Sequence, residues 1–162
     1  EGFDAGIRYG GTVPEDMVAQ SLSGEIAWVV VASPAYVRRH GAPLHPSELN
    51  KHRCLGIRLG TGRIYEWEFD RGSESVQVPV PGAITIDDGA FARALVERDF
   101  GLMYTPGPSV VDLVNAGRLQ YVLEDWRSMG PPFHMYYSSR RQVPAGLKLL
   151  IDLIREMKPL GL

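Results

Sequence analysis

Cysteine and histidine are the residues best suited to catalysis or metal binding, and their spacing in this chain favours neither. Cys54 is the only cysteine, and His52 precedes it by two positions. Residues so spaced on a strand share one face without being guaranteed contact, whereas a cysteine nucleophile needs a base within hydrogen-bond reach. The four histidines show no zinc-binding pattern such as HxxxH. We therefore expect no catalytic residues, no metal and no cofactor, and predict binding without turnover.

An acidic pair, Asp87 and Asp88, lies between a predicted strand that ends at Ile86 and a predicted helix over residues 90–98. An aspartate here can cap the helix and favour its positive end. Ligands in open α/β sheets also gather at the carboxyl ends of strands, so Ile86, Asp87, Asp88 and Gly89 are candidate ligand-binding residues. Free amides at the helix start could hold a ligand carboxylate, but the two aspartates oppose an anion. The pattern leaves the charge of the ligand undetermined.

Two other predicted strand ends carry polar side chains. Arg8 and Tyr9 close a short strand; Arg8 is either a surface residue or the cation of a ligand site, since a guanidinium holds a carboxylate in a bidentate fork. Tyr104, Thr105 and Pro106 join another strand to a helix start. Thr105 could cap that helix or donate a hydrogen bond to a ligand. All five residues are candidates for ligand binding.

Predicted strands and helices alternate along nearly the whole chain. Ile26–Ala32 reads IAWVVVA, an apolar and β-branched run typical of a strand buried on both faces of a parallel sheet. Such alternation predicts an α/β fold with mostly parallel sheets. Further strands are expected at residues 4–9, 53–58, 83–86, 102–104, 120–123 and 134–137, a hairpin at 66–80, and helices at 35–40, 90–98, 108–116 and after Pro144. Trp28, Trp67 and Trp126 are expected to anchor a core or a lobe interface.

Two extended runs, Ile26–Ala32 and residues 134–137, bracket a complete set of strands and helices. A chain that crosses from one lobe to a second and later returns needs two such runs. We therefore predict a two-lobed protein with a hinge of two crossing strands and a ligand cleft between the lobes. Residues 33–132 would form the second lobe, and residues 1–32 with 133–162 the first.

The charge and composition exclude two classes of partner. Seventeen Lys and Arg against nineteen Asp and Glu give a net charge of −2, and the basic residues are scattered. Since DNA binding needs clustered cations, we expect this chain to be a poor nucleic-acid binder by itself. No apolar run approaches the ~18–20 residues of a membrane span. A single cysteine allows no internal disulfide and fits a reducing cytoplasm.

A series of short motifs runs along almost the whole chain. They are DAGIR at residues 4–8; VASPAY at 31–36 with HGAP at 40–43; PSEL at 46–49 with His52; Trp67 with Phe69; Asp87 with Asp88; GLM at 101–103 with Pro106; AGRL at 116–119 with Leu123 and Trp126; and Tyr136, Tyr137 and Arg140 before a terminal amphipathic helix. Each motif is weakly specific, but their order resembles the effector-binding domain of LysR-type bacterial transcription regulators. One departure is Asp99, Phe100 and Gly101, where that family more often has two spaced glycines.

The resemblance implies a two-lobed fold like that of periplasmic binding proteins, and a small-molecule effector. It places Ser33 and Pro34 at the hinge and ligand pocket, although they could simply terminate a strand. It also implies that DNA is contacted only through an N-terminal helix-turn-helix domain outside this chain, and that the protein is a homo-oligomer, a dimer or at full length a tetramer. No membrane partner is expected. The alternatives are a solute-binding protein of a transport system and a related two-lobed enzyme.

The resemblance further implies that the first lobe lacks its opening β–α–β–α stretch in this chain. We therefore expect uncovered sheet edges near residues 4–9 and an uncovered apolar stripe near residues 147–154. Open strand edges and apolar stripes favour pairing with another chain.

Overall fold

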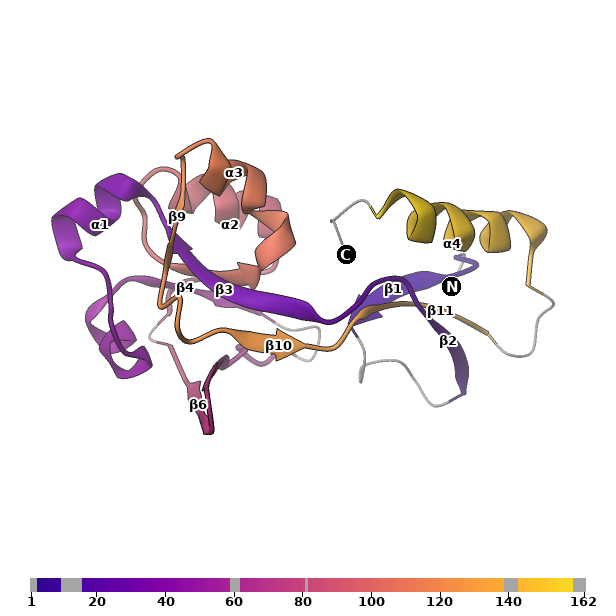
Figure 1. Cartoon of the computed structure of the whole chain (residues 1–162), viewed down its shortest axis with the longest axis horizontal. Coiled ribbons are helices and arrows are strands. Elements are labelled where there is room, and N and C mark those ends of the chain that lie inside the picture. Colours follow the sequence, from indigo (N-terminus) through magenta and orange to yellow (C-terminus); the bar gives the residue numbers. More distant parts are fainter. Residues whose placement is uncertain (1–2, 10–15, 59–61, 81, 139–142, 159–162) are drawn as a thin grey trace. The chain divides into compact units, whose positions relative to one another are not determined.

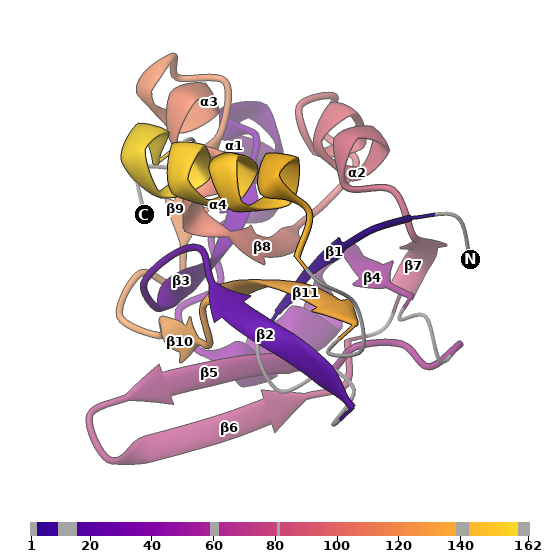
Figure 2. The same cartoon turned by 90° about the vertical axis from the view of Figure 1, so that its right-hand side faces the viewer.

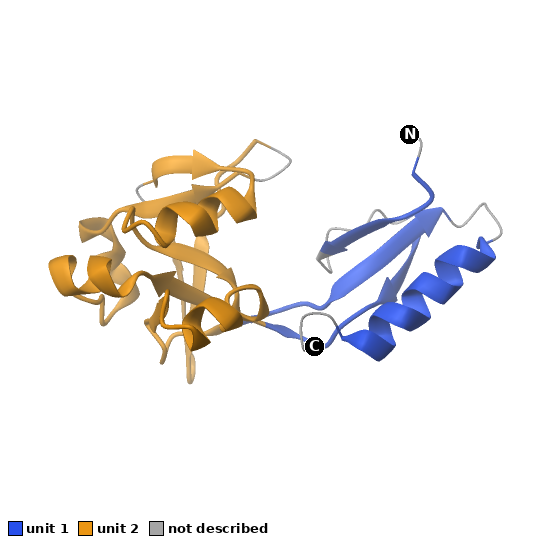
Figure 3. Cartoon of the chain, turned by 90° about the horizontal axis from the view of Figure 1, so that it is seen from above, with its two compact units in different colours: residues 1–26, 129–162 blue, residues 27–128 orange. Residues whose placement is uncertain are grey.

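A computed structural model gives the structure of the chain, and it describes all residues except 1–2, 10–15, 59–61, 81, 139–142 and 159–162. Two compact units are present, coloured separately in Figure 3. Unit 1 comprises Glu1–Ile26 and Met129–Leu162, and unit 2 comprises Ala27–Ser128. The units divide after Ile26 and after Ser128, whereas the sequence predicts divisions a few residues later in the chain, after residues 32 and 132. Arg140, from the last motif, lies outside the described residues.

Unit 1 is a three-stranded antiparallel sheet with one helix packed against it. The strands are β1 (Gly6–Tyr9), β2 (Met17–Ser21) and β11 (Phe133–Ser138), in the order β1-β11-β2. Helix α4 (Ala145–Met157) lies along the sheet in Figure 2. Its residues Leu147 and Ile151 pack against Met135 and Tyr137 of β11 in a small core.

Helix α4 is apolar beyond the face that it buries against the sheet. Four large hydrophobic side chains on it are between 46% and 70% exposed: Leu149, Leu150, Leu153 and Met157. The sequence predicts one apolar stripe on this helix, made of Leu147, Leu150, Ile151, Ile154 and Met157. Leu147, Ile151 and Ile154 of that stripe pack on the sheet, whereas Leu150 and Met157 are exposed. The exposed parts of these four side chains are not covered by any described residue of this chain.

Unit 2 is built on a mixed sheet whose long strand is β3 (Ile26–Ala32). It pairs with β8 (Met103–Pro106) and β9 (Gln120–Val122), both antiparallel, and neighbours β10 (Ser128–Gly130). Strand β4 (Cys54–Ile57) pairs in parallel with β7 (Gly82–Ile86). A parallel bridge between Cys54 and Leu102 joins these two strands to the start of β8.

Both faces of this sheet are buried. Helices α2 (Gly89–Val96) and α3 (Val111–Asn115) lie on one side, and the hairpin of β5 (Trp67–Arg71) and β6 (Glu74–Val78) lies on the other (Figures 1 and 2). Alternate residues of β3 supply the two cores: Val29 and Val31 pack on the helix side, whereas Val30 and Ala32 pack on the hairpin side. The uninterrupted apolar run in the sequence is explained by this two-sided burial.

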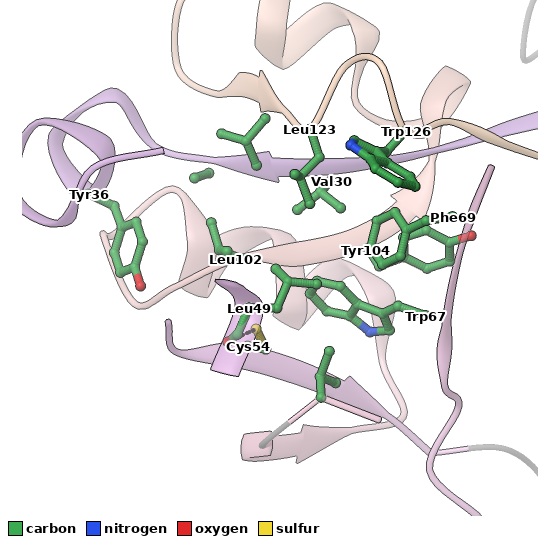
Figure 4. Close-up of a cluster of buried hydrophobic side chains, with 13 residues drawn as sticks. Val30, Tyr36, Leu49, Cys54, Trp67, Phe69, Leu102, Tyr104, Leu123 and Trp126 are labelled. Atoms are coloured by element: carbon green, nitrogen blue, oxygen red, sulfur yellow. Dashed lines mark hydrogen bonds between the residues drawn. The ribbon is translucent and has the colours of Figure 1, made fainter. Parts of the chain in front are cut away.

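The hairpin side holds the larger side chains of the two cores. Trp67, Phe69, Tyr104 and Trp126 gather there, as Figure 4 shows. Tyr36 reaches the same core from α1 (Pro34–His40), and Leu49 reaches it from the short 3-10 helix η1 (Pro46–Lys51). The expectation that Trp67 and Trp126 anchor a core is confirmed.

The α/β class predicted from the sequence is confirmed, with three corrections. The sheets are not mostly parallel, because β3 runs against β8 and β9, and unit 1 is antiparallel throughout its described pairs. Strands β2 and β10 were not predicted. Residues 134–137 do not form the second crossing run, because they belong to β11, the central strand of unit 1.

A short 3-10 turn, η2 (Gly107–Ser109), precedes α3. Within the described residues, no helix has the length and apolarity needed to cross a membrane.

Candidate functional site

The strand register of unit 2 brings several predicted ligand-binding residues to one edge of the sheet. Ile57 pairs with Ile86 at the ends of β4 and β7, and the Arg58 amide donates to the Ile86 carbonyl at 3.0 Å. Because β4, β7 and β8 are parallel, their carboxyl ends share this edge, which we call the carboxyl edge. In α/β sheets such an edge is where ligands usually bind.

The turn from β7 into α2 supplies an acidic patch at the carboxyl edge. Asp88 is the N-cap of α2, and its carboxylate accepts a hydrogen bond from the Phe91 amide at 2.6 Å. The predicted capping role is therefore confirmed. Asp87, Asp88 and Gly89 are exposed, whereas Ile86 is buried in the helix-side core. Asp87 does not cap the helix, so its carboxylate is the acidic group here that could contact a ligand.

Thr105 and Pro106 bring the end of β8 to the same edge. Thr105 is buried, with its hydroxyl 3.0 Å from that of Ser109. Since Ser109 gives its single proton to the Pro106 carbonyl at 2.7 Å, Thr105 is the donor of this pair. Thr105 does not cap a helix, because it lies within β8 and the N-cap of η2 is Pro106.

Tyr104 is the centre of an aromatic stack in the hairpin-side core. Its ring lies between those of Trp28, at 4.9 Å, and Trp67, at 5.5 Å, both nearly parallel to it. Its hydroxyl donates to the Glu68 carbonyl at 2.9 Å, and burial raises its pKa well above the ordinary value. Tyr104 is therefore buried and bonded, while Trp28 and Tyr65 form the half-buried rim of the stack. Neither rim residue was among the predicted site residues.

Ser33 and Pro34 lie at the opposite edge of the sheet. Val31 pairs with Met103 at the start of β8, so the end of β3 is remote from Pro106, which pairs with Trp28. Ser33 is 2% exposed; its hydroxyl donates to the Asp99 carboxylate at 2.5 Å and accepts from the Tyr36 amide at 3.0 Å. Pro34 is the first residue of α1. The structure thus does not bring Ser33 and Pro34 together with the residues of the carboxyl edge.

Asp99 takes the place of a glycine in the turn where LysR-type effector-binding domains more often have two spaced glycines, and its conformation explains how this is possible. It has φ of 63°, a left-handed conformation that glycine and, less readily, aspartate adopt. The bond from Ser33 gives its carboxylate a fixed partner 66 residues away. Ser33 and Asp99 therefore join the start of α1 to the turn that precedes β8.

Replacing Ser33 by alanine tests this structural role. We expect S33A to lower the free energy of unfolding by about 1–2 kcal/mol, because α1 loses its cap and Asp99 loses its donor. Urea denaturation measures the loss. As a control, S47A removes an exposed serine hydroxyl from η1, and it should change stability by less than about 0.5 kcal/mol. An unchanged stability of S33A would contradict the assignment.

Arg8 and Tyr9 belong to unit 1, at the end of β1. The Arg8 guanidinium lies over the Tyr136 ring, 5.2 Å from its centroid. Tyr136 itself passes over Gly6, where an added Cβ would come within 2.5 Å of the ring. Arg8 is exposed on this strand and already has an aromatic partner. Its role in ligand binding stays a prediction, as does that of Tyr9.

Cys54 and His52 do not form a catalytic pair. Cys54 is fully buried, its thiol lies 3.6 Å from the Leu49 carbonyl, and burial raises its pKa to about 12. A thiol in this state is a poor nucleophile. His52 instead contacts Tyr36. Among the described residues, no group of three or more His, Cys, Asp or Glu side chains is placed to hold a metal ion.

Solved structures of transcription regulators share this fold. The regulatory domain of CrgA from Neisseria meningitidis superposes with a TM-score of 0.80 at 24% identity, over 94% of this chain and 74% of that one. The full-length virulence activator AphB of Vibrio cholerae superposes with a TM-score of 0.77 at 24% identity, over 95% of this chain and 51% of that one. The fold is therefore that of an α/β regulatory domain of the periplasmic-binding-protein type.

Sequence comparison gives the family. The family model of the LysR substrate binding domain matches residues 1–159. A putative transcriptional regulator of Pseudomonas aeruginosa is 32% identical over 98% of this chain, and the HTH-type transcriptional regulator YcaN of Escherichia coli is 32% identical over 96%. The chain spans about half the length of these relatives, 52% and 50%. It belongs to the LysR substrate-binding-domain family, whose members are transcription regulators and not enzymes.

Proposed function

We propose that this domain senses a small-molecule effector at the carboxyl edge of unit 2 and thereby controls DNA binding by its protein. The observation that carries the proposal is the meeting of the β4, β7 and β8 ends at one edge of the sheet. The exposed Asp87 follows β7 and the turn into η2 follows β8, with β4 between these two strands. Membership of the LysR family supports a sensing role over solute transport. Within the unit, the ligand contacts would come from Asp87, Gly89 and Pro106.

The DNA contacts would be made elsewhere in the protein. The net charge of −2 and the scattered basic residues argue against DNA binding by this domain. YcaN and other relatives are named as HTH-type regulators. We propose that a helix-turn-helix domain in the same protein binds DNA and that the protein acts in the cytoplasm. Effector binding would change the affinity of that helix-turn-helix domain for operator DNA.

Calorimetry against small organic acids and aromatic metabolites tests the proposed site. A ligand that binds the wild-type domain should bind D87A at least about tenfold more weakly, since one lost polar contact to a ligand can be worth about 1.4 kcal/mol or more. D112A, on exposed α3, is the matched control and should bind normally. Equal affinity of D87A and wild type would refute the site, and a converted product would refute pure sensing.

We also propose that the apolar outer face of α4 is covered in the working protein. Four exposed hydrophobic side chains on one helix are costly to leave in water. We expect the 162-residue chain alone to be dimeric or larger, unless a separate segment supplies the missing cover. Light scattering of the wild type and of L149K/L153K checks this: the variant should shift toward monomer. A wild-type chain that stays monomeric at high concentration with no added segment would disprove it.

A further inference from the structure

A partly buried hydrogen bond between a tyrosine and a histidine connects α1 to the segment that links η1 to β4. Tyr36 is 1% exposed, and its phenol oxygen lies 3.2 Å from Nδ1 of His52. The same oxygen accepts a hydrogen bond from the Arg53 amide at 3.1 Å. Tyr36 lies on α1, whereas His52 and Arg53 lie between η1 and β4. One phenol therefore forms the polar connection between two segments that are distant in sequence.

The direction of the bond follows from the single proton of the phenol. Because the Arg53 amide already donates to the oxygen, the phenol proton is free to be given to an acceptor. His52 Nδ1 is the acceptor within reach among the described residues. A hydroxyl proton that is shielded from water and has no acceptor is costly, so the geometry favours a neutral His52 with its proton on Nε2. Protonation at Nδ1 would turn this acceptor into a second donor facing the Tyr36 oxygen.

We propose that the bond between Tyr36 and His52 is an acid-sensitive latch, which holds α1 in place and opens when His52 takes up a proton. The groups that face His52 are His40 from α1 and Glu48 and Lys51 from η1. Glu48 is the one anion of the three, and its carboxylate is engaged by the Leu44 amide at 2.8 Å. The nearby Cys54 thiol stays neutral. A charge on His52 would thus be poorly compensated.

The electrostatic surroundings act in the same direction as the geometry. Burial first, and the neighbouring His40 second, lower the pKa of His52 below its ordinary value of 6.5. The unfolded chain therefore binds the proton more readily than the folded one. The stability that neutral His52 contributes is complete above pH 6.5, and it falls as the pH drops from 6.5 toward the folded pKa. Opening would loosen α1 itself, whereas β3 is held by its own pairs with β8 and β9, which involve neither Tyr36 nor His52.

Hydrogen exchange of the complete protein at about pH 7.5 and about pH 5 tests the latch. The reporters are the amides of Arg53, which donates to Tyr36, and Gly41, which donates to Val37 within α1. After correction for intrinsic exchange, we expect their protection in the wild type to fall several-fold at the lower pH, because protonation of His52 favours the open state. The amides of β3 that pair with β8 should change less.

Two variants separate the latch from general acid sensitivity. H52Q keeps an acceptor oxygen for the phenol but cannot titrate, so its reporters should lose no more protection than the β3 amides. H134Q removes a histidine from unit 1 and should behave as the wild type. Equal loss in H52Q and the wild type, or no loss in the wild type, would overturn the proposal.

A measurement on the wild type alone gives an independent check. Nitrogen NMR of labelled histidine should show His52 with its proton on Nε2 at neutral pH and a pKa below 6.5. A neutral His52 with its proton on Nδ1 would overturn the proposal whether or not H52Q folds.

Discussion

Replacing Gly101 by alanine should unfold unit 2 at far lower urea concentrations than the wild type needs. A Cβ at this position would overlap the Arg53 carbonyl oxygen, a backbone atom that cannot rotate away. That same carbonyl accepts from the Leu102 amide at 2.7 Å, and the Leu102 carbonyl accepts from Leu55 at 2.9 Å. The added methyl group must therefore push β8 away from β4. We expect a loss of about 3 kcal/mol or more.

A matched control is G89A, in the same unit. A Cβ on Gly89 would lie no closer than 3.7 Å to another atom, the end of the flexible Arg93 side chain. G89A should therefore change the free energy of unfolding by less than about 0.5 kcal/mol. Similar stabilities of G101A and G89A would show that the contact between β4 and β8 is looser than described.

Truncating Tyr104 should destabilise unit 2 by about 3–5 kcal/mol, the usual cost of removing a buried aromatic side chain. The ring contacts Trp28, Trp67 and Phe69, so its loss opens a cavity in the middle of the aromatic stack. Y104F keeps the ring and loses the hydroxyl, which donates to the Glu68 carbonyl. We expect about 1 kcal/mol for that change.

Urea denaturation of Y104A and Y104F measures both contributions. A large loss in Y104F would assign the stability to the hydrogen bond and contradict the dominance of packing. A small loss in Y104A would show that the stack collapses around the missing ring. If Tyr104 is structural, as its burial indicates, Y104F should also bind any effector with wild-type affinity.

The elements that could be predicted from the sequence are those marked by local signals. Ile26–Ala32 is a strand over the predicted residues, because an unbroken apolar run needs burial on both faces. Asp88 caps a helix as its type and position indicate. In contrast, β2 was missed because Val18 is the only β-branched residue in Met17–Ser21, and because its partner β11 lies more than a hundred residues away. The bond from Gln20 to Tyr137 spans 117 positions.

The site was harder to predict because it depends on register. Ser33 and Asp87 both follow predicted strands, so nothing in the sequence alone ranks one above the other. In the structure, β3 runs against β8, and this places the end of β3 at the edge opposite to the ends of β4, β7 and β8. Spacing along a chain does not reveal which way a strand runs relative to its neighbours. The contacts of Ser33 with Asp99 and of Tyr36 with His52 were not predicted either, because they join segments 66 and 16 positions apart that only the tertiary fold brings together.

The order of strands in unit 1 determines which unit can fold first during synthesis on the ribosome. Strands β1 and β2 flank β11 and pair with it, so neither finds its partner until the residues after unit 2 have been synthesised. Unit 2 is one continuous stretch, Ala27–Ser128, and can complete its two cores as soon as it leaves the exit tunnel. Translation adds roughly 5–20 residues per second, so the first strands wait for seconds with their edges unpaired. During that interval both edges of β1 and of β2 lack a partner strand, whereas in the finished sheet each of the two strands pairs with β11 along one edge.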